Sequence, residues 1–302
     1  MEENKLVSVI IPTYRRPQFL VRAITSIFNQ TYPNIEIIVV DDNGKGTIYQ
    51  KETEILLAPF INGKRIKYIV HNENKNGSAA RNTGIQASKG IFITFLDDDD
   101  VLFPKKIERQ VELLENNKKY DGAYVGFEII LGNKKLKSVI PHKEGNLQYD
   151  LLSANWSIGT GSNPMFRKKV FNSIGLFDVT FIRHQDIEFL VRFFRTHQIG
   201  VIPDILISRY IDNRDNKVDC KKLIQVKDKF LSTFNEDIKS YEKKRQNIIF
   251  RAQYADIACH AIQEKEYKLA FNFYKKANSY KLLSLKIIAK AIAYGLFNYK
   301  VE

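Results

Sequence analysis

Residues 90–100, "GIFITFLDDDD", hold a short apolar segment that ends in four consecutive aspartates. The run "IFITF" is typical of a buried β-strand. Ionised carboxylates at the end of such a strand repel one another and oppose burial, unless a cation or several hydrogen-bond donors compensate. The segment therefore predicts a strand that carries an acidic cluster into a binding site, with a positive partner that this stretch of sequence does not supply.

Apolar patterns before this segment predict the sheet to which it belongs. Two β-branched runs, Leu6–Pro12 and Ile35–Asp42, flank a segment whose apolar residues recur every three or four positions, as in a helix. This β-α-β unit implies parallel strands with a right-handed crossover. Arg65–His71 predicts a third strand, and the next segment predicts a helix with Ser78 as its N-cap. We expect an α/β fold with a mainly parallel, doubly wound sheet flanked by helices.

Beyond the aspartates the pattern changes once more along the chain. The sheet region continues with a predicted helix, a hairpin, a second helix and a strand, at residues 105–116, 122–141, 185–197 and 199–212. After Asn216 the β-branched pattern stops and only helical periodicity remains. The sequence therefore predicts two domains, an α/β domain over 1–216 and a helical domain over 217–302.

The charge of the chain is concentrated in the predicted helical domain. The 302 residues carry a net charge of +13, and residues 217–302 contribute 18 Lys/Arg against 9 Asp/Glu. Residues 267–301 contain seven lysines and no acid, around the apolar run "LLSLKIIAKAIAYGLF" with Lys286 and Lys290 one turn apart. This pattern favours contact with an anionic membrane surface, although packing against other helices is the commoner use of an apolar stripe.

Several classes of protein are disfavoured by the composition. The two cysteines, Cys220 and Cys259, show neither a disulfide framework nor zinc-ligand spacing. The N-terminal apolar run is too short for a signal peptide, and no uncharged apolar stretch reaches 18 residues. Nucleic acid is not an expected partner, because no helix-turn-helix, zinc or RNP-type signature accompanies the basic tail. We expect a cytoplasmic protein, peripheral on the inner face of the membrane, and leave a homodimer open.

Polar residues cluster where the predicted parallel strands end, the edge at which such sheets bind ligands. The four ends are Pro12–Pro17, Asp41–Gly46, His71–Gly77 and Asp97–Asp100. An aromatic such as Tyr14 can stack on a nucleobase, and a carboxylate such as Asp42 can accept a hydrogen bond from an imide. Asp97 and Asp99 offer the oxygen ligands that a hard divalent cation prefers. The cluster therefore predicts a site completed by a metal ion and a nucleoside diphosphate.

The ordered motifs resemble the inverting, metal-dependent glycosyltransferases of family 2, which have the GT-A fold. The resemblance covers about residues 5–215 and rests on "VSVIIPTYRRP", "IEIIVVDDNG", "GSAARNTGIQASKGIFITFLDDDD", "GLFD" and "QDIEFLVRF". It implies a hexosyltransferase that takes a sugar from a nucleotide sugar, UDP-sugars being the favoured class, with Mn²⁺ or Mg²⁺ as cofactor. It also implies a glycan or lipid-linked acceptor in bacterial surface-polysaccharide or glycoprotein synthesis.

The same resemblance implies roles for individual residues. Asp186 matches the general base that deprotonates the acceptor hydroxyl, and Asp97 and Asp99 match the metal-binding DxD pair. Trp156 and Gln185 are acceptor-side candidates, although burial in the core is the better expectation for Trp156. The residues assigned to the nucleotide and donor are Pro12, Thr13, Tyr14, Arg16, Asp41, Asp42, Arg81, Asp97 and Asp98.

Two positions depart from the family pattern. Many relatives have Glu-Asp where this chain has Gln185-Asp186, which leaves the base in place but alters the surroundings of the acceptor. Many relatives also have a His after the last sheet strand, where this chain offers Asp212.

Other interpretations of the same residues are weighed against the enzyme. Taken alone, Asp41 and Asp42 could cap a turn and Asp186 could be the favourable charge at a helix N-terminus. A sugar nucleotidylyltransferase would need a glycine-rich phosphate loop after the first strand, and "PTYRRP" cannot supply one because prolines lack a backbone donor. A catalytically weak nucleotide-sugar-binding protein is the other alternative, although neither the DxD pair nor the base is lost.

Overall fold

The computed structural model describes residues 4–63, 65–155, 158–211 and 219–280. Its contacts divide the chain into two units, Met1–Gln148 with Ser157–Asn213 and Tyr149–Trp156 with Arg214–Glu302. The predicted domain boundary at residue 216 lies outside the described residues. The sequence pattern did not predict that the short segment from Tyr149 belongs with the C-terminal unit.

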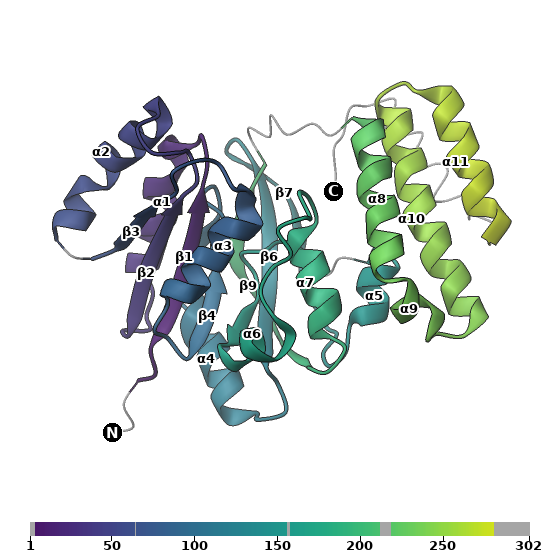
Figure 1. The fold of residues 1–302 in the computed structure, drawn as a ribbon. Helices are drawn as coiled ribbons and strands as arrows, with labels where there is room; N and C mark the ends of the chain where they lie inside the picture. Colours follow the sequence, from purple (N-terminus) through teal and green to yellow (C-terminus); the bar gives the residue numbers. More distant parts are fainter. Residues whose placement is uncertain (1–3, 64, 156–157, 212–218, 281–302) are drawn as a thin grey trace. The chain divides into compact units, whose positions relative to one another are not determined.

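The first unit is built on one mixed sheet with the strand order β3-β2-β1-β4-β8-β6-β9-β5, and β7 pairs with β6 (Figure 1). Pairing is parallel among β1, β2, β3 and β4 and between β6 and β9, and antiparallel at the other contacts. The strands are β1 Val7–Thr13, β2 Ile35–Asp41, β3 Lys67–Val70, β4 Phe92–Phe95, β5 Val101–Leu102, β6 Gly122–Leu131, β7 Lys134–Val139, β8 Met165–Arg167 and β9 Ile199–Tyr210.

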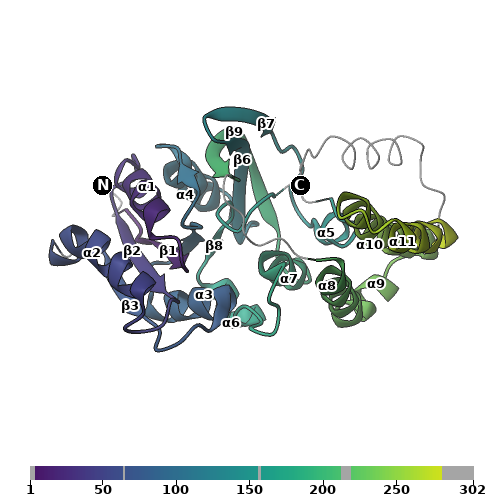
Figure 2. The same cartoon turned by 90° about the horizontal axis from the view of Figure 1, so that it is seen from above.

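Helices cover both faces of this sheet, because successive side chains of a strand point to opposite faces. Val7, Val9 and Ile11 of β1 pack in one core with α1 and α4, and Ile10 faces α3. Figure 2 shows α1 and α4 on one side of the sheet and α3 and α6 on the other. The helices of this unit are α1 Pro17–Phe28, α2 Ile48–Asn62, α3 Asn76–Ala87, α4 Lys106–Asn116, α6 Lys169–Ile174 and α7 Gln185–Phe193. The short helix α5 Gln148–Leu152 has its first residue in this unit and the rest in the second unit.

The predicted β-α-β unit is present, with local causes that the sequence shows. Pro17 occupies the first turn of α1, where its missing N–H is not needed. β1 and β2 pair in parallel from Val7 opposite Ile35 to Thr13 opposite Asp41. Both strands therefore end at the same edge, and the polar residues that follow them are brought together there.

The predicted N-cap of α3 was wrong. The helix begins at Asn76 rather than after Ser78, and the Asn76 Oδ1 accepts hydrogen bonds from the backbone N–H groups of Ser78 and Ala79. Asn76 has a φ of 76°, a conformation that asparagine tolerates better than most residues. Its side chain thus satisfies two of the free donors in the first turn of the helix, the role that was expected of Ser78 for the donors one turn later.

A cluster of phenylalanines fixes α7 to the sheet. Phe189 stacks on Phe177 with ring centroids 4.6 Å apart and on Phe171 at 5.3 Å, and it meets Phe166 of β8 edge to face. Buried aromatic pairs contribute beyond the area they remove from water. Arg192 adds a second tie, because it pairs with Glu188 one turn earlier and donates to the carbonyls of Ile174 and Leu176.

Besides most of α5, the second unit contains the described helices α8 Cys220–Thr233, α9 Asn235–Lys239, α10 Lys243–Gln263 and α11 Tyr267–Tyr280. The Asp219 side chain caps α8 by accepting from the backbone N–H of Lys222. Lys227 is buried, and its charge is matched by Asp256 at 2.6 Å and by the Gln253 side-chain oxygen at 2.8 Å. Among the described residues, no helix is both long enough and apolar enough to cross a membrane. The basic run around Lys286 and Lys290 lies outside the described residues.

We predict that Gly84→Ala lowers the free energy of unfolding by about 1–3 kcal/mol, although alanine is the better helix former. A Cβ at Gly84 of α3 would lie 2.3 Å from Ile10 Cγ2 of β1, so helix and strand would have to separate. Urea unfolding measures the change. In the double variant with Ile10→Ala the added methyl group has room, so its penalty should shrink. A stabilising Gly84→Ala would show that α3 does not approach the sheet this closely.

Candidate functional site

The carboxyl ends of the parallel strands gather most of the predicted site residues at one edge of the sheet. Thr13 ends β1 and Arg16 follows it, Asp41 ends β2 and Asp42 follows it, and the four aspartates follow β4. Arg81 comes from α3, and Gln185 and Asp186 come from the first turn of α7. Trp156 and Asp212 lie outside the described residues, so their predicted roles stay predictions.

The four aspartates divide into two pairs by exposure. Asp97 and Asp99 are partly exposed, whereas Asp98 and Asp100 are buried, each with 1% of its surface accessible. The turn that they form is closed by a hydrogen bond from the backbone N–H of Asp100 to the carbonyl of Asp97. Only Asp97 and Asp99 can therefore present a carboxylate to a ligand at this edge.

The buried pair is held by hydroxyl groups. Thr13 donates to Asp98 Oδ2 at 2.8 Å, and Ser162 donates to Asp100 Oδ2 at 2.7 Å. Burial raises the pKa of Asp98 to about 7, although Arg16 acts in the opposite direction. Burial, together with repulsion from Asp99 and Asp97, likewise raises the pKa of Asp100. Asp98, which we assigned to donor binding, is positioned to orient Thr13 and Arg16.

Two arginines of the chain itself neutralise the cluster. Arg16 forms ion pairs with Asp98, at 2.7 Å, and with Asp99, and Arg81 Nη2 lies 2.6 Å from Asp97 Oδ1. Burial alone would lower the pKa of Arg16, but Asp98 and Asp99 raise it above its usual value. The sequence analysis looked for the missing positive charge in a metal ion, and the structure shows that part of it is supplied by protein side chains.

The donor set of the exposed pair fits a hard divalent cation. Asp97 and Asp99 offer carboxylate oxygens only, and Thr160 adds a hydroxyl 3.4 Å from Asp97 Oδ2. Oxygen ligands without sulfur or imidazole suit Mg²⁺ or Mn²⁺. Residues that would hold such an ion are therefore present, on the condition that the arginine contacts loosen when it binds.

The two aspartates at the end of β2 already have protein partners. Asp42 accepts from the Lys75 N–H at 2.8 Å and the Asn74 amide at 2.8 Å, and lies 2.7 Å from His71 Nδ1. Asp41 is fully buried, and it accepts a hydrogen bond from the Tyr68 hydroxyl at 2.6 Å. Burial raises the pKa of Asp41, partly opposed by that hydrogen bond.

Tyr14, for which base stacking is predicted, lies at the surface. Tyr14 is 38% exposed at the end of β1, and the Arg15 guanidinium lies 5.0 Å from the centre of its ring. Pro12 is partly exposed beside it. This surface is open to a planar ligand, whereas the nearby Asp41 and Asp42 carboxylates are turned into the protein.

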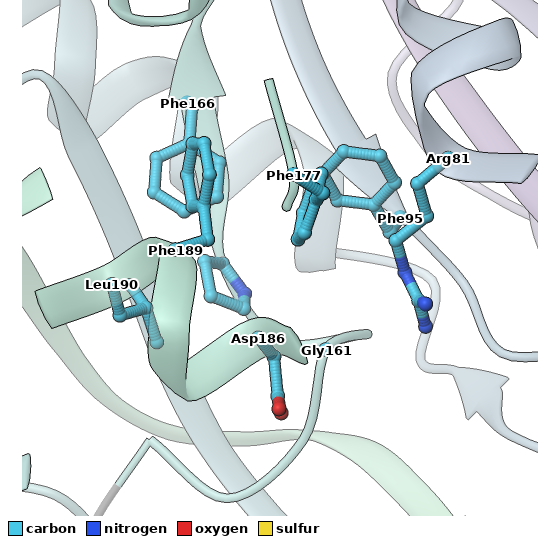
Figure 3. A pocket seen from close by; sticks show the side chains of 9 residues that line it. Arg81, Phe95, Gly161, Phe166, Phe177, Asp186, Phe189 and Leu190 are labelled. Atoms are coloured by element: carbon cyan, nitrogen blue, oxygen red, sulfur yellow. The ribbon is translucent and has the colours of Figure 1, made fainter. Parts of the chain in front are cut away.

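Asp186 and Arg81 lie on either side of Gly161 (Figure 3). A Cβ at Gly161 would be 3.4 Å from Arg81 Nη2 and 3.9 Å from Asp186 Cβ, so the glycine leaves room between them. Both residues line a pocket whose wall is formed by Phe95, Phe166, Phe177 and Phe189. Burial raises the pKa of Asp186, while Arg81 lowers it and Asp97 raises it.

Gln185 contacts the same arginine. Arg81 Nη1 donates to the Gln185 side-chain oxygen at 3.1 Å while Nη2 holds Asp97. One guanidinium thus joins the acidic turn after β4 to the start of α7. The residue before this helix, His184, has a φ of 57°, which turns the chain sharply into Gln185.

The sequence analysis missed several side chains that complete the site. Thr160 and Ser162 lie in an irregular segment without periodic pattern, and they contact Asp97 and Asp100. His71, at the end of β3, carried a signal, because it is a titratable residue at a predicted strand end. Its contact with Asp42 could not be assigned before the register of β2 and β3 was known.

Comparison with known proteins identifies relatives over most of the first unit. The family described as Glycosyl transferase family 2 matches residues 8–175. A protein of Rickettsia bellii named an uncharacterized glycosyltransferase is 34% identical over 218 residues, 70% of this chain and 31% of the relative. One from Methanocaldococcus jannaschii with a similar name is 30% identical over 71% of this chain and 73% of the relative. The chain thus spans about a third of the length of some of these relatives.

One relative carries a specific activity in its name. It is the Escherichia coli UDP-Glc:alpha-D-GlcNAc-diphosphoundecaprenol beta-1,3-glucosyltransferase WfgD, 34% identical over 159 residues, which are 52% of this chain and 58% of the enzyme.

Solved structures share the fold at low sequence identity. S. aureus TarS in complex with UDP-GlcNAc superposes with a TM-score of 0.59 at 14% identity, over 91% of this chain and 89% of TarS. The mannosyltransferase PcManGT from Pyrobaculum calidifontis, in complex with GDP-Man and Mn²⁺, gives 0.58 at 15% identity, over 99% and 82%. At these identities the likeness shows a common fold.

A buried lysine next to the acidic turn generates a pH prediction. Lys106 is fully buried at the start of α4 and donates to the Thr94 hydroxyl at 3.1 Å. Burial lowers the pKa of Lys106 to about 7, although Asp100 raises it. Above that pH the unfolded chain binds a proton that the folded chain lacks, so stability rises with pH through this group.

We expect the free energy of unfolding of the wild type, relative to that of Lys106→Met, to increase by about 1–3 kcal/mol as the pH rises from about 7 to about 10. Denaturant titrations in the presence of a chelator, at several pH values, measure the difference. Lys105→Met, which changes the exposed neighbouring lysine, is the control and should run parallel to the wild type. Parallel curves for Lys106→Met would mean that Lys106 keeps an ordinary pKa.

Proposed function

The chain belongs to glycosyltransferase family 2 and has the GT-A fold, and from this premise we propose that it transfers a sugar from a nucleoside-diphosphate sugar to an acceptor hydroxyl with inversion. The observation that carries the proposal is the position of Arg81. Its guanidinium contacts both Asp97 and Gln185, and Gly161 lies close to both Arg81 and Asp186. Arg81 and Asp186 line one pocket, and Arg81 also holds Asp97, so one guanidinium links the carboxylate proposed for the diphosphate to the pocket of the proposed base.

We propose that the nucleotide lies along the ends of β1 and β2. Tyr14 offers an exposed ring for stacking, and Pro12 and Thr13 line the strand end beside it. The roles of Asp41 and Asp42 in base recognition remain proposals, and Asp42 would have to exchange one of its present partners for the base. UDP-sugars are the proposed donors, in line with the UDP-Glc in the name of WfgD and the UDP-GlcNAc bound to TarS.

Asp97 and Asp99 would hold Mn²⁺ or Mg²⁺, which when bound supplies positive charge to the departing diphosphate. Arg16 and Arg81 now neutralise the same carboxylates. Once these carboxylates are neutralised by a bound divalent cation, the two guanidinium groups would be released and could donate hydrogen bonds to phosphate oxygens, for which arginine is well suited. Thr13 and Asp98 would hold Arg16 in place during this exchange, because Asp98 is buried and contacts both.

Asp186 is the proposed base. It would take the proton of the acceptor hydroxyl, and the freed oxygen would form a bond to the anomeric carbon from the face opposite the diphosphate. The bond from the anomeric carbon to the diphosphate oxygen breaks in the same step, so the configuration inverts. Burial raises the pKa of Asp186, and a higher pKa makes a carboxylate a stronger base near neutral pH.

The acceptor and the location of the reaction are proposals as well. The WfgD name specifies a diphosphoundecaprenol-linked sugar, and we propose a lipid-linked or glycan acceptor for this chain, in surface-polysaccharide synthesis. A cytoplasmic enzyme that touches the anionic inner face of the membrane would meet such an acceptor. The lysine-rich residues 267–301 are the proposed contact, and most of them lie outside the described residues.

We predict that Asp99→Ala abolishes sugar transfer and weakens the binding of Mn²⁺ and of the metal-dependent nucleoside diphosphate by at least about tenfold, since one of two carboxylate ligands is lost. Calorimetric titrations with UDP, with and without Mn²⁺, measure binding apart from activity. Asp204→Ala, which removes an exposed carboxylate of β9, is the control and should bind as the wild type does. Full activity of Asp99→Ala in excess chelator would contradict the metal proposal.

We predict that Asp186→Asn lowers kcat by roughly 10² or more while the Kd for the donor changes little, because the amide keeps the shape but cannot accept the proton. Steady-state kinetics with a panel of nucleotide sugars, with the product anomer assigned by NMR, give both quantities. Asp178→Asn, in the loop before α7, should remain active. A product that retains the configuration of the donor would rule out a single displacement with Asp186 as base.

A further inference from the structure

The second unit brings together three side chains that the sequence keeps apart. Cys220 opens α8, and His260 and Glu264 lie one turn apart at the end of α10. α8 and α10 lie side by side in Figures 1 and 2, so the start of one meets the end of the other. One potential ligand atom of each residue, the Cys220 sulfur, a His260 ring nitrogen and a Glu264 oxygen, lies within 4.8 Å of the other two.

We propose that Cys220, His260 and Glu264 form a zinc site that fastens the start of α8 to the last turn of α10. Thiolate, imidazole and carboxylate are the three ligand types that zinc takes in proteins. This site is separate from the proposed sugar-transfer site, where the donors are oxygens. The sequence shows no zinc-ligand spacing because Cys220 lies 40 residues before His260 and 44 before Glu264, and the packing of two helices brings them together.

The distances allow coordination after small side-chain rotations. With Zn–S of about 2.3 Å and Zn–N or Zn–O of about 2.0 Å, tetrahedral ligand atoms lie roughly 3.3–3.5 Å apart. His260 Nε2 and Glu264 Oε1 are already 3.5 Å apart. The separations of up to 4.8 Å must therefore shrink by about 1 Å, which rotations of the histidine and glutamate side chains can supply, since both remain partly exposed.

The acidic residues around Cys220 favour the binding of a cation beside its thiol, although the chain as a whole is basic. Asp219, Glu264 and Glu266 are acidic neighbours that all act on the Cys220 thiol. The thiol is buried against Ala261 and Ala270, so one side of the cluster is apolar and the other meets solvent through His260. Binding would replace the thiol proton, so one Zn²⁺ enters and one H⁺ leaves to solvent. A water molecule would complete the fourth position.

A simpler role for the same residues is a hydrogen-bonded helix cap. The backbone N–H of Cys220 donates to Glu264 Oε2 at 3.0 Å, which satisfies a free donor at the start of α8. That contact uses one carboxylate oxygen and leaves Oε1, the atom nearest to His260, for a metal. The helix cap predicts that the protein binds no zinc here, and the proposed site predicts that it binds one zinc ion. Both roles are compatible with the same packing of α8 against α10.

The test uses the full-length protein carrying Asp99→Ala, which weakens metal binding at the oxygen-lined site. After dialysis against a chelator, the protein is titrated with Co²⁺ and then with Zn²⁺. A thiolate-to-cobalt charge-transfer band with one equivalent of Co²⁺, displaced by Zn²⁺, is the expected result. Thermal unfolding with and without Zn²⁺ should show a rise of several degrees, because a ligand bound only by the folded state stabilises it.

Matched variants decide between the two roles. The chain has only two cysteines, so Cys220→Ser should abolish the band while Cys259→Ser keeps it. His260→Ala should weaken Co²⁺ binding by at least about tenfold, because the loss of an outer-shell partner already costs about that much and His260 is a direct ligand. If Cys220→Ser fails to fold, His260→Ala in the wild-type cysteine background carries the test. Absence of the band in the parent protein, or its persistence in Cys220→Ser, would overturn the zinc site and leave the helix cap.

Discussion

The contact between the Arg81 guanidinium and the Asp97 carboxylate, 2.6 Å apart, holds the site of the first unit together. Arg81 comes from α3, Asp97 follows β4, and the second arm of the same guanidinium reaches Gln185, 104 residues further along the chain. A planar group with several donors can hold two partners at fixed angles, which a lysine cannot do. The geometry of the pocket therefore depends on where α3 places one arginine.

That placement depends in turn on close packing beneath the site. α3 can approach β1 because residue 84 is glycine, and the Asn76 side chain satisfies the first donors of the helix. On the far side of the pocket, Phe177 and Phe189 stack at 4.6 Å and fix the start of α7. Asp186 and Arg81 are thus carried by two elements that pack separately against the sheet and are joined to each other through the Arg81–Gln185 hydrogen bond.

The sequence predicted the main strands and the edge at which the polar residues gather, because the carboxyl ends of neighbouring parallel strands lie at the same edge of a sheet. Strands β5 and β8 were missed, since two and three residues are too few to show a period. The partners of the buried aspartates were also missed, because Thr160 and Ser162 lie in an irregular segment whose path only the folded chain defines. The family resemblance identified Arg81 and Asp186, but not that Gln185 shares the same guanidinium.

The Gln185 contact gives the departure from the family pattern a physical meaning. A glutamate at this position would place a second carboxylate at the arm of Arg81 that now meets a neutral oxygen at 3.1 Å. It would compete with Asp97 for the same positive charge and add a negative charge beside Asp186, whose pKa Asp97 already raises. With glutamine at this position, Asp97 is the one carboxylate that pairs directly with Arg81 in the described residues, and Arg81 keeps more of its positive charge for the pocket than it would beside a glutamate.

The run of four aspartates is best understood as two pairs with different tasks. Asp98 holds Thr13 and Arg16 at the end of β1, and Asp100 holds Ser162, so the buried pair braces the loops on either side of the turn. Burial raises the pKa of both Asp98 and Asp100, and donors of the chain offset that cost. Arg16 pairs with Asp98 and Asp99, Arg81 pairs with Asp97, and hydroxyl groups donate to Asp98 and Asp100. Asp97 and Asp99 are the two that are partly exposed. A cluster that looks costly as four adjacent charges is therefore tolerated because arginines and hydroxyl groups of the same chain compensate it.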